Sequence, residues 1–179
     1  SSAPGQAPMA PPTLVGDLGG GALYLALGVM AAILHARTSG QGQVVDAAIV
    51  DGSANMMNLL LSLHAAGQQP MERGKGLLDG PHWYGTFACA DGQYISIGAL
   101  EPQFYAILLD KLGLHEEGVL NKQYDPRHWQ AWRERLTALF LTQARPYWVE
   151  LLEGSDACFA PVLDPRQAAQ HPHIRERGI

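Results

Sequence analysis

The segment Gly16–Gly21, with the sequence GDLGGG, combines a carboxylate with a run of glycines. A carboxylate just before a helix lies beside backbone N–H groups without helical partners, near the positive end of the helix dipole. Such N–H groups can stabilise an enolate or a tetrahedral adduct, and Asp17 could itself act as a base or a nucleophile. The same residues also fit a helix capped by Asp17 and packed closely through its glycines. The pattern alone favours this structural interpretation.

Glu101 is a second candidate, because it follows a strand-like segment and precedes Pro102. Proline suits the first turn of a helix, and the helix N-terminus favours an ionised carboxylate. Glu101 could therefore tune a neighbouring acid or base, or it could be only an anion near the helix start. The spacing does not separate these two roles.

The other reactive side chains give weaker signals. His64 and His82 flank a glycine-rich stretch, where a histidine could donate a proton. We nevertheless expect all seven histidines to be surface residues or hydrogen-bonded structural residues. Cys158 has no adjacent base that would lower the pKa of its thiol, so it is expected to be buried and unreactive. His171 and His173 have no cysteine or carboxylate near them in sequence, so no metal site is expected.

The composition limits the classes of function. The 179 residues include 12 basic and 17 acidic side chains, for a net charge of −5, and 47% are apolar. This apolar content supports a core, and the length suits one domain or parts of two. Because no basic patch is present, binding to nucleic acid is not expected. Two widely separated cysteines and no signal-peptide pattern favour a cytoplasmic protein, and the absence of an initial methionine suggests a piece of a longer chain.

The first half of the chain is expected to be mainly helical after a coil or linker over 1–12. After a turn at Gly16-Asp17, a helix should run from the glycines to about Arg37 and end at Gly40. Its uncharged run predicts a buried core helix and no membrane span. The chain should continue with a short buried strand within 44–50 and a helix over 51–63.

A second unit is expected beyond the glycine- and proline-rich stretch 67–82, where the periodicity stops. Alternating apolar residues predict a hairpin over 84–100, with its turn at 90–92. The remaining expected elements are helices over 102–113, 126–141 and 147–152, a strand over 158–162 and a helical turn over 165–170. Trp129, Trp132 and Phe140 lie at helical spacing and are expected in the core.

Three separated blocks of sequence resemble a known family. They are GDLGGGALYLALGVMAAILHARTSGQGQVVDAAIVDG, LLDGPHWYGTFACADGQYISIGALEPQFY and DACFAPVL. Together they resemble the family III CoA-transferase superfamily, and the segment IGALEPQFY is similar to its racemase branch, the α-methylacyl-CoA racemases. The resemblance extends from about residue 11 to residue 179.

This resemblance implies an α/β fold class. It implies part of a Rossmann-like large domain, a small α+β domain, and two subunits interlocked as a homodimer. The chain would then comprise the C-terminal part of the large domain (1–47), a linker with a helix (48–84), the small domain (85–163) and the start of a return linker (164–179).

The resemblance also implies roles for the candidate residues. Asp17 matches one of two acid/base residues that move the α-proton of a 2-methyl-branched acyl-CoA, and the other is a histidine upstream of this sequence. Glu101 matches a carboxylate that hydrogen-bonds to that histidine and tunes it. Tyr84 matches a residue lining the same site. Racemases carry an asparagine four residues before the aspartate, where this chain has Thr13.

The expected function is racemisation of 2-methyl-branched acyl-CoA thioesters through an enolate. The N–H groups from Asp17 through Gly19, Gly20 and Gly21 are expected to bind the substrate by stabilising the enolate oxygen. No metal or other cofactor is expected, because the thioester itself acidifies the α-carbon. Two alternatives stay open: a CoA-transferase in which Asp17 forms a mixed anhydride, and an inactive fragment with only an assembly role. The 179-residue piece alone is expected to be inactive.

Overall fold

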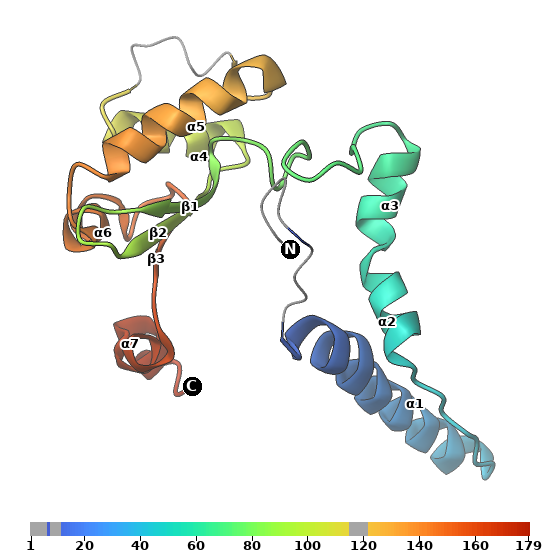
Figure 1. The fold of residues 1–179 in the computed structure, drawn as a ribbon. Helices are drawn as coiled ribbons and strands as arrows, with labels where there is room; N and C mark the ends of the chain where they lie inside the picture. Colours follow the sequence, from blue (N-terminus) through green and yellow to red (C-terminus); the bar gives the residue numbers. More distant parts are fainter. Residues whose placement is uncertain (1–6, 8–11, 115–121) are drawn as a thin grey trace. The chain divides into compact units, whose positions relative to one another are not determined.

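The chain divides into two compact units, residues 1–73 and residues 74–179 (Figure 1). The computed structural model describes residue 7 and the ranges 12–114 and 122–179. The division falls inside the stretch 67–82, where the sequence predicts a boundary. Most of the coil expected over 1–12 lies outside the described residues.

The first unit begins with a long helix. A π-helical segment, η1 (Leu14–Ala22), continues into α1 (Leu23–Ser39), and Gly40 ends α1 with a φ of 75°. The expected end at Gly40 is therefore confirmed, because glycine adopts the left-handed conformation without strain. The expected turn at Gly16-Asp17 is wrong, since both residues lie within η1.

The long helix exposes its apolar surface within the described part of the chain. No residue of α1 is buried there, so the expected core helix is not seen in this unit. The combined helix Leu14–Ser39 is long and apolar enough to cross a membrane, by length and composition only. Core helices of soluble proteins meet the same criterion.

Two short helices follow, α2 (Ile49–Met56) and α3 (Asn58–Ala65), where one helix is expected. The buried strand expected within 44–50 is wrong, because residues 41–48 form no regular element and Val44 is 93% exposed. No strand lies beside this segment in the described part of the first unit, so its backbone has nothing to pair with.

The second unit contains a three-stranded antiparallel sheet in the order β1-β2-β3. The strands are β1 (Tyr84–Ala88), β2 (Tyr94–Gly98) and β3 (Phe159–Val162). The hairpin between β1 and β2 turns at Gly92, which has a φ of 73°, and this turn is confirmed.

Three helices cover one face of the sheet: α4 (Pro102–Lys111), α5 (Pro126–Phe140) and α6 (Arg145–Leu152). Alternation places Phe87, Ile95 and Ile97 on that face, where they join the buried core. Trp129 and Phe140 are buried and Trp132 packs against the core, as expected from their helical spacing.

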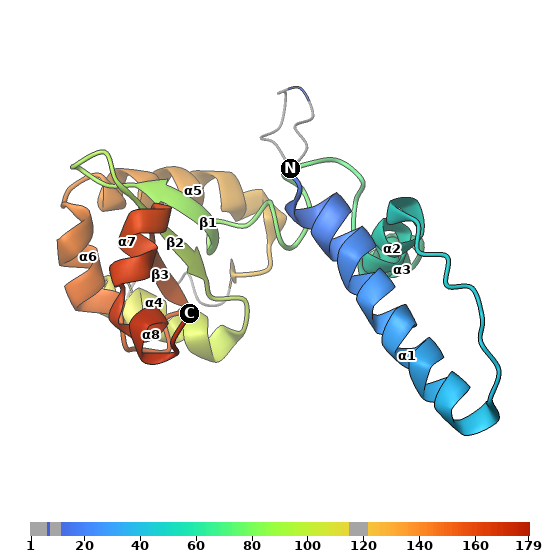
Figure 2. The same cartoon turned by 90° about the horizontal axis from the view of Figure 1, so that it is seen from below.

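The chain ends in two short helices, α7 (Pro165–Gln170) and α8 (Pro172–Glu176), after β3. They lie on the opposite side of the sheet from α5 (Figure 2). The helical turn over 165–170 is confirmed, and the side chain of Asp164 caps it by accepting from the N–H groups of Arg166 and Gln167. Helix α8, which begins at Pro172, is not anticipated from the sequence.

Candidate active site

Asp17 lies in the first turn of η1 with an exposed carboxylate. In a π-helix each N–H bonds to the carbonyl five residues earlier, and here the first such bond joins Leu18 N–H to the Thr13 carbonyl at 3.1 Å. The N–H groups of Val15, Gly16 and Asp17 therefore precede the helical hydrogen bonds. Within the described ranges, the Asp17 side chain makes no hydrogen bond or ion pair. The structure thus places an uncommitted carboxylate beside the positive end of a helix.

The N-cap position of η1 belongs to Thr13 and not to Asp17. Thr13 has a φ of 59° and makes no capping bond through its side chain. A positive φ is rare for a β-branched residue and carries conformational strain. The structural alternative for Asp17, a simple helix cap, is therefore wrong.

The glycines after Asp17 serve packing in this structure. The N–H groups of Gly19, Gly20 and Gly21 fall within the π-helical hydrogen bonds, so this conformation does not leave them free to stabilise an enolate. A Cβ on Gly20 would lie 2.6 Å from Ser53 Oγ. A Cβ on Gly52 would overlap the carbonyl of Gly20. The glycines let η1 and α2 approach closely, which is the packing role considered for them from the sequence.

Glu101 occupies the N-cap position of α4. Its carbonyl accepts the N–H groups of Phe104 and Tyr105 at 3.1 and 3.0 Å, while its side chain makes no capping bond. The exposed carboxylate raises the pKa of the Cys158 thiol, after the larger effect of burial. Glu101 is therefore close enough to Cys158 to act on it electrostatically.

Tyr84 and Cys158 line the same pocket of about 510 Å³ in the second unit. Tyr84 begins β1 opposite Gly98 of β2, and Cys158 immediately precedes β3. Cys158 is exposed, so its expected burial is wrong, because the segment before β3 opens onto this pocket. Its raised pKa keeps the thiol protonated at neutral pH, which makes it a poor nucleophile.

Gln123 joins the segments that precede Tyr84 and Glu101. Its buried side chain donates through Nε2 to the carbonyls of Ala99 and Leu100, at 3.1 and 2.9 Å. Its backbone carbonyl accepts the indole N–H groups of Trp83 and Trp129, at 3.1 and 2.8 Å. Gln123 is not predicted from the sequence, because only the folded chain brings these distant segments together.

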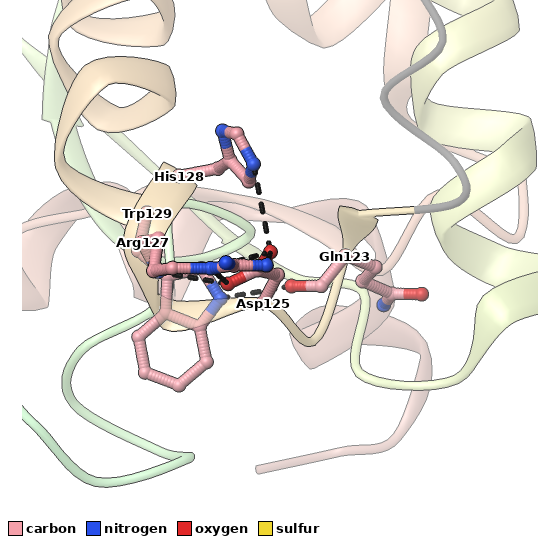
Figure 3. A network of polar contacts seen from close by, with 5 residues as sticks. All are labelled: Gln123, Asp125, Arg127, His128 and Trp129. Carbon is pink, nitrogen blue, oxygen red and sulfur yellow. Dashed lines mark hydrogen bonds and ion pairs between the residues drawn. The ribbon is translucent and has the colours of Figure 1, made fainter.

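The start of α5, two residues after Gln123, is fixed by a capping aspartate. Asp125 caps the helix by accepting from the backbone N–H of Arg127, and it also forms a two-pronged ion pair with the Arg127 guanidinium (Figure 3). This side-chain hydrogen bonding lowers the pKa of Asp125 to about 2. His128 lies 3.5 Å from the same carboxylate. The cap is therefore ionised throughout the neutral and mildly acidic range.

His82 is buried and structural, in agreement with the interpretation of the histidines as structural residues. Its Nε2 lies 2.6 Å from the Tyr105 hydroxyl, and its Nδ1 is buried without a partner in the described part of the protein. Burial, and secondly the charge of Arg133, lower the pKa of His82 to about 4. His64 is exposed, with Nδ1 2.8 Å from the Gln69 carbonyl. Neither histidine lines the pocket beside Tyr84.

The predicted site residues fall into both units. Asp17 and the three glycines belong to the first unit, and Tyr84 and Glu101 belong to the second. Within the described ranges, no group of three or more side chains is arranged to hold a metal ion. Each unit thus contributes its own group of candidate residues.

The chain combines a small α+β unit with a glycine-rich helix start whose aspartate side chain has no partner among the described residues. The model of CoA-transferase family III matches residues 1–179. The chain belongs to CoA-transferase family III, and its fold is the mixed helix-and-sheet fold of that family.

Curated relatives point to two kinds of acyl-CoA enzyme. The chain is 37% identical to α-methylacyl-CoA racemase of Mus musculus and 35% identical to that of Homo sapiens, over 97% of this chain and 46% of each relative. It is 23% identical to the human succinyl-CoA:glutarate CoA-transferase, over 96% of this chain and 40% of that one. The chain therefore spans about half the length of these relatives.

Solved structures share the fold. A hypothetical protein from Mycobacterium tuberculosis matches with a TM-score of 0.70 and 22% identity, over 96% of this chain and 46% of that one. A CaiB/BaiF family protein from Brucella suis matches with the same TM-score and 21% identity, over 99% of this chain and 48% of that one.

Proposed function

We propose that the full-length protein racemises 2-methyl-branched acyl-CoA thioesters. The observation that carries this proposal is the exposed carboxylate of Asp17 in the first turn of η1, which has no partner among the residues that the structure describes. It occurs in a chain that is 35–37% identical to proteins named α-methylacyl-CoA racemase.

The proposed reaction begins with removal of the proton α to the thioester carbonyl. Asp17 is suited to exchange this proton, because no hydrogen bond or ion pair within the described residues occupies its carboxylate. The electron pair moves onto the carbonyl oxygen and forms an enolate, whose charge needs donors already in place. The N–H groups of Val15, Gly16 and Asp17, which precede the π-helical hydrogen bonds, are the donors we propose.

A second acid/base group must return a proton to the opposite face of the enolate. We propose that a histidine outside residues 1–179 does this, and that the Glu101 carboxylate tunes it. The Glu101 side chain is exposed and does not cap α4, so it is available for such a contact. Tyr84 is proposed to line the acyl site, and the full-length protein is proposed to form a homodimer.

CoA transfer is the second candidate function. It is supported by the family and by the likeness to the human succinyl-CoA:glutarate CoA-transferase. An exposed aspartate would also suit attack on a thioester, with formation of a mixed anhydride and release of the CoA thiolate.

Two assays on the full-length protein separate these functions. Incubation with one enantiomer of a 2-methylacyl-CoA, followed by chiral analysis, should show both enantiomers with the wild type and none of the second with Asp17→Asn. Hydroxylamine should trap no acyl group on Asp17. A hydroxamate of Asp17 itself, formed when hydroxylamine attacks the aspartyl carbonyl of the mixed anhydride and displaces the acyl group as its carboxylate, with chirality unchanged, would establish the transferase instead.

A further inference from the structure

The pocket beside Tyr84 contains a cation to which the proposed racemisation assigns no role. Arg133 of α5 lines this pocket of about 510 Å³, and every residue lining it belongs to the second unit. The lining also includes an acid, Asp79, and the hydroxyl-bearing residues Thr86 and Ser96.

The Arg133 guanidinium is held in a fixed position. Its Nη2 donates to the carbonyls of Pro81 and Tyr84 at 3.1 and 2.9 Å. The centre of the guanidinium lies 5.4 Å from the centroid of the Phe87 ring. Gly85 lies directly beside it, since a Cβ there would lie 2.7 Å from Arg133 Nη2.

Three of the five N–H groups of Arg133 have no partner within the described ranges. Nη2 uses its two N–H groups on the two carbonyls, which leaves those of Nη1 and Nε. No carboxylate among the described residues forms an ion pair with Arg133. Burial lowers the pKa of its guanidinium, and no neighbouring acid offsets that effect. A half-buried cation with unused donors is a site at which an anion is favoured.

Asp79 makes the pocket selective for the charge of that anion. Its two carboxylate oxygens accept the N–H groups of Gly74 and Gly76, both at 2.8 Å, so they are already engaged. One negative and one positive side chain in the same pocket favour a singly charged carboxylate over a doubly charged phosphate. Leu78 and Ala160, which also line the pocket, provide apolar surface for a short hydrocarbon chain.

We propose that Arg133 makes this pocket a subsite for a carboxylate at the far end of the acyl group. The preferred substrates would then be 2-methyl-branched dicarboxylic acyl-CoA thioesters. This inference rests on the proposed function, because it takes the acyl group to lie beside Tyr84.

The test compares two CoA thioesters that differ only at the end of the acyl chain. In 2-methylglutaryl-1-CoA the chain ends in a carboxylate, and in 2-methylpentanoyl-CoA it ends in a methyl group. Calorimetry with the full-length Asp17→Asn protein should give a dissociation constant about tenfold lower for the dicarboxylic thioester, since hydrogen bonds to charged groups are the stronger ones. Arg133→Met should remove this preference, and Arg133→Lys should keep part of it.

The controls make each outcome decisive. Equal affinity of the two thioesters for Asp17→Asn overturns the subsite, and this comparison needs no substitution at Arg133. A loss of affinity for free CoA in Arg133→Met would assign the pocket to a CoA phosphate and also overturn the proposal. If the wild type racemises neither thioester while the Arg133-dependent preference persists, the subsite stands and the proposed function fails.

Discussion

Asp17 and Glu101 are both carboxylates near a helix start, but the structure gives them different surroundings. Asp17 lies in the first turn of η1, which follows the strained Thr13. Its side chain makes no hydrogen bond or ion pair within the described residues. Glu101 is the N-cap residue of α4, and its own carbonyl begins that helix. These surroundings support the proposed proton exchange at Asp17 and the proposed action of Glu101 on a neighbouring group.

His82 makes the stability of the second unit depend on pH. Its pKa is about 4 in the folded protein and about 6.5 in the unfolded chain, mainly because burial disfavours the imidazolium. Between pH 4 and pH 6.5 the unfolded chain binds more protons than the folded protein. The contribution of neutral His82 to the free energy of unfolding is therefore complete above pH 6.5 and is lost as the pH falls to 4. We expect a loss of roughly 3 kcal/mol in the free energy of unfolding. Urea unfolding of the full-length protein at several pH values measures it.

The control for this pH dependence is a second histidine. In His82→Gln the slope between pH 6.5 and 4 should become shallower, whereas the exposed His35→Gln on α1 should keep the wild-type slope. An unchanged slope in His82→Gln would show that other groups cause the dependence.

The candidate residues differ in how well the sequence predicts them. Asp17, Glu101 and Tyr84 stand out through local patterns and through the resemblance to a family. Gln123 and Arg133 do not, because their contacts cross 24 and 52 residues of chain. The burial of the Gln123 side chain and the cavity that Arg133 lines arise only when α5 packs against the sheet.

At the scale of elements, the contact between η1 and α2 depends on paired glycines. Gly52→Ala should destabilise the full-length protein by about 1–3 kcal/mol, because its Cβ would overlap the backbone of Gly20 and force the helices apart. Thermal or urea unfolding checks this. Gly42→Ala is the matched control, since nothing lies within 4 Å of its Cβ and its φ is not left-handed. A Gly52→Ala protein as stable as Gly42→Ala would refute the close approach.

Gln123 connects the start of α5 to the end of β2. Gln123→Ala should cost about 1–3 kcal/mol of unfolding free energy, because the buried carbonyl of Ala99 loses its side-chain donor and that of Leu100 keeps only the Tyr124 hydroxyl. Gln130→Ala provides the comparison, since its side chain makes one exposed hydrogen bond, to Glu134. Equal stability of the two variants in urea unfolding would contradict the role of Gln123.

Elements with strong end signals are predicted well from the sequence. The hairpin turn at Gly92 and the helix starts at Pro102 and Pro126 follow from local backbone preferences. The errors lie in the first unit, where local preference decides less. The turn expected at Gly16-Asp17 is replaced by a π-helix packed on α2, and the apolar segment 44–50 finds no strand to pair with.

At the scale of the whole molecule, the chain belongs to CoA-transferase family III. It spans about half the length of its curated relatives, and α1 has no buried residue in the described part of it. We predict that residues 1–179 alone do not racemise a 2-methylacyl-CoA, whereas the full-length protein does, because the proposed second acid/base group is a histidine outside this segment. Activity of the isolated segment would refute the need for that group. Inactivity of both would favour a purely assembly role.

The central claim, that Asp17 exchanges the α-proton of a thioester, is tested most directly by hydrogen exchange. The full-length protein would be incubated in D₂O with a single enantiomer of a 2-methylacyl-CoA, and mass spectrometry and chiral analysis would follow the α-deuterium and the configuration together. We predict that deuterium enters as the configuration scrambles, and that Asp17→Asn, with its fold intact by circular dichroism, loses at least scrambling. The claim would be contradicted if Asp17→Asn scrambled the configuration and took up α-deuterium as the wild type does. It would also be contradicted if the wild type took up no α-deuterium.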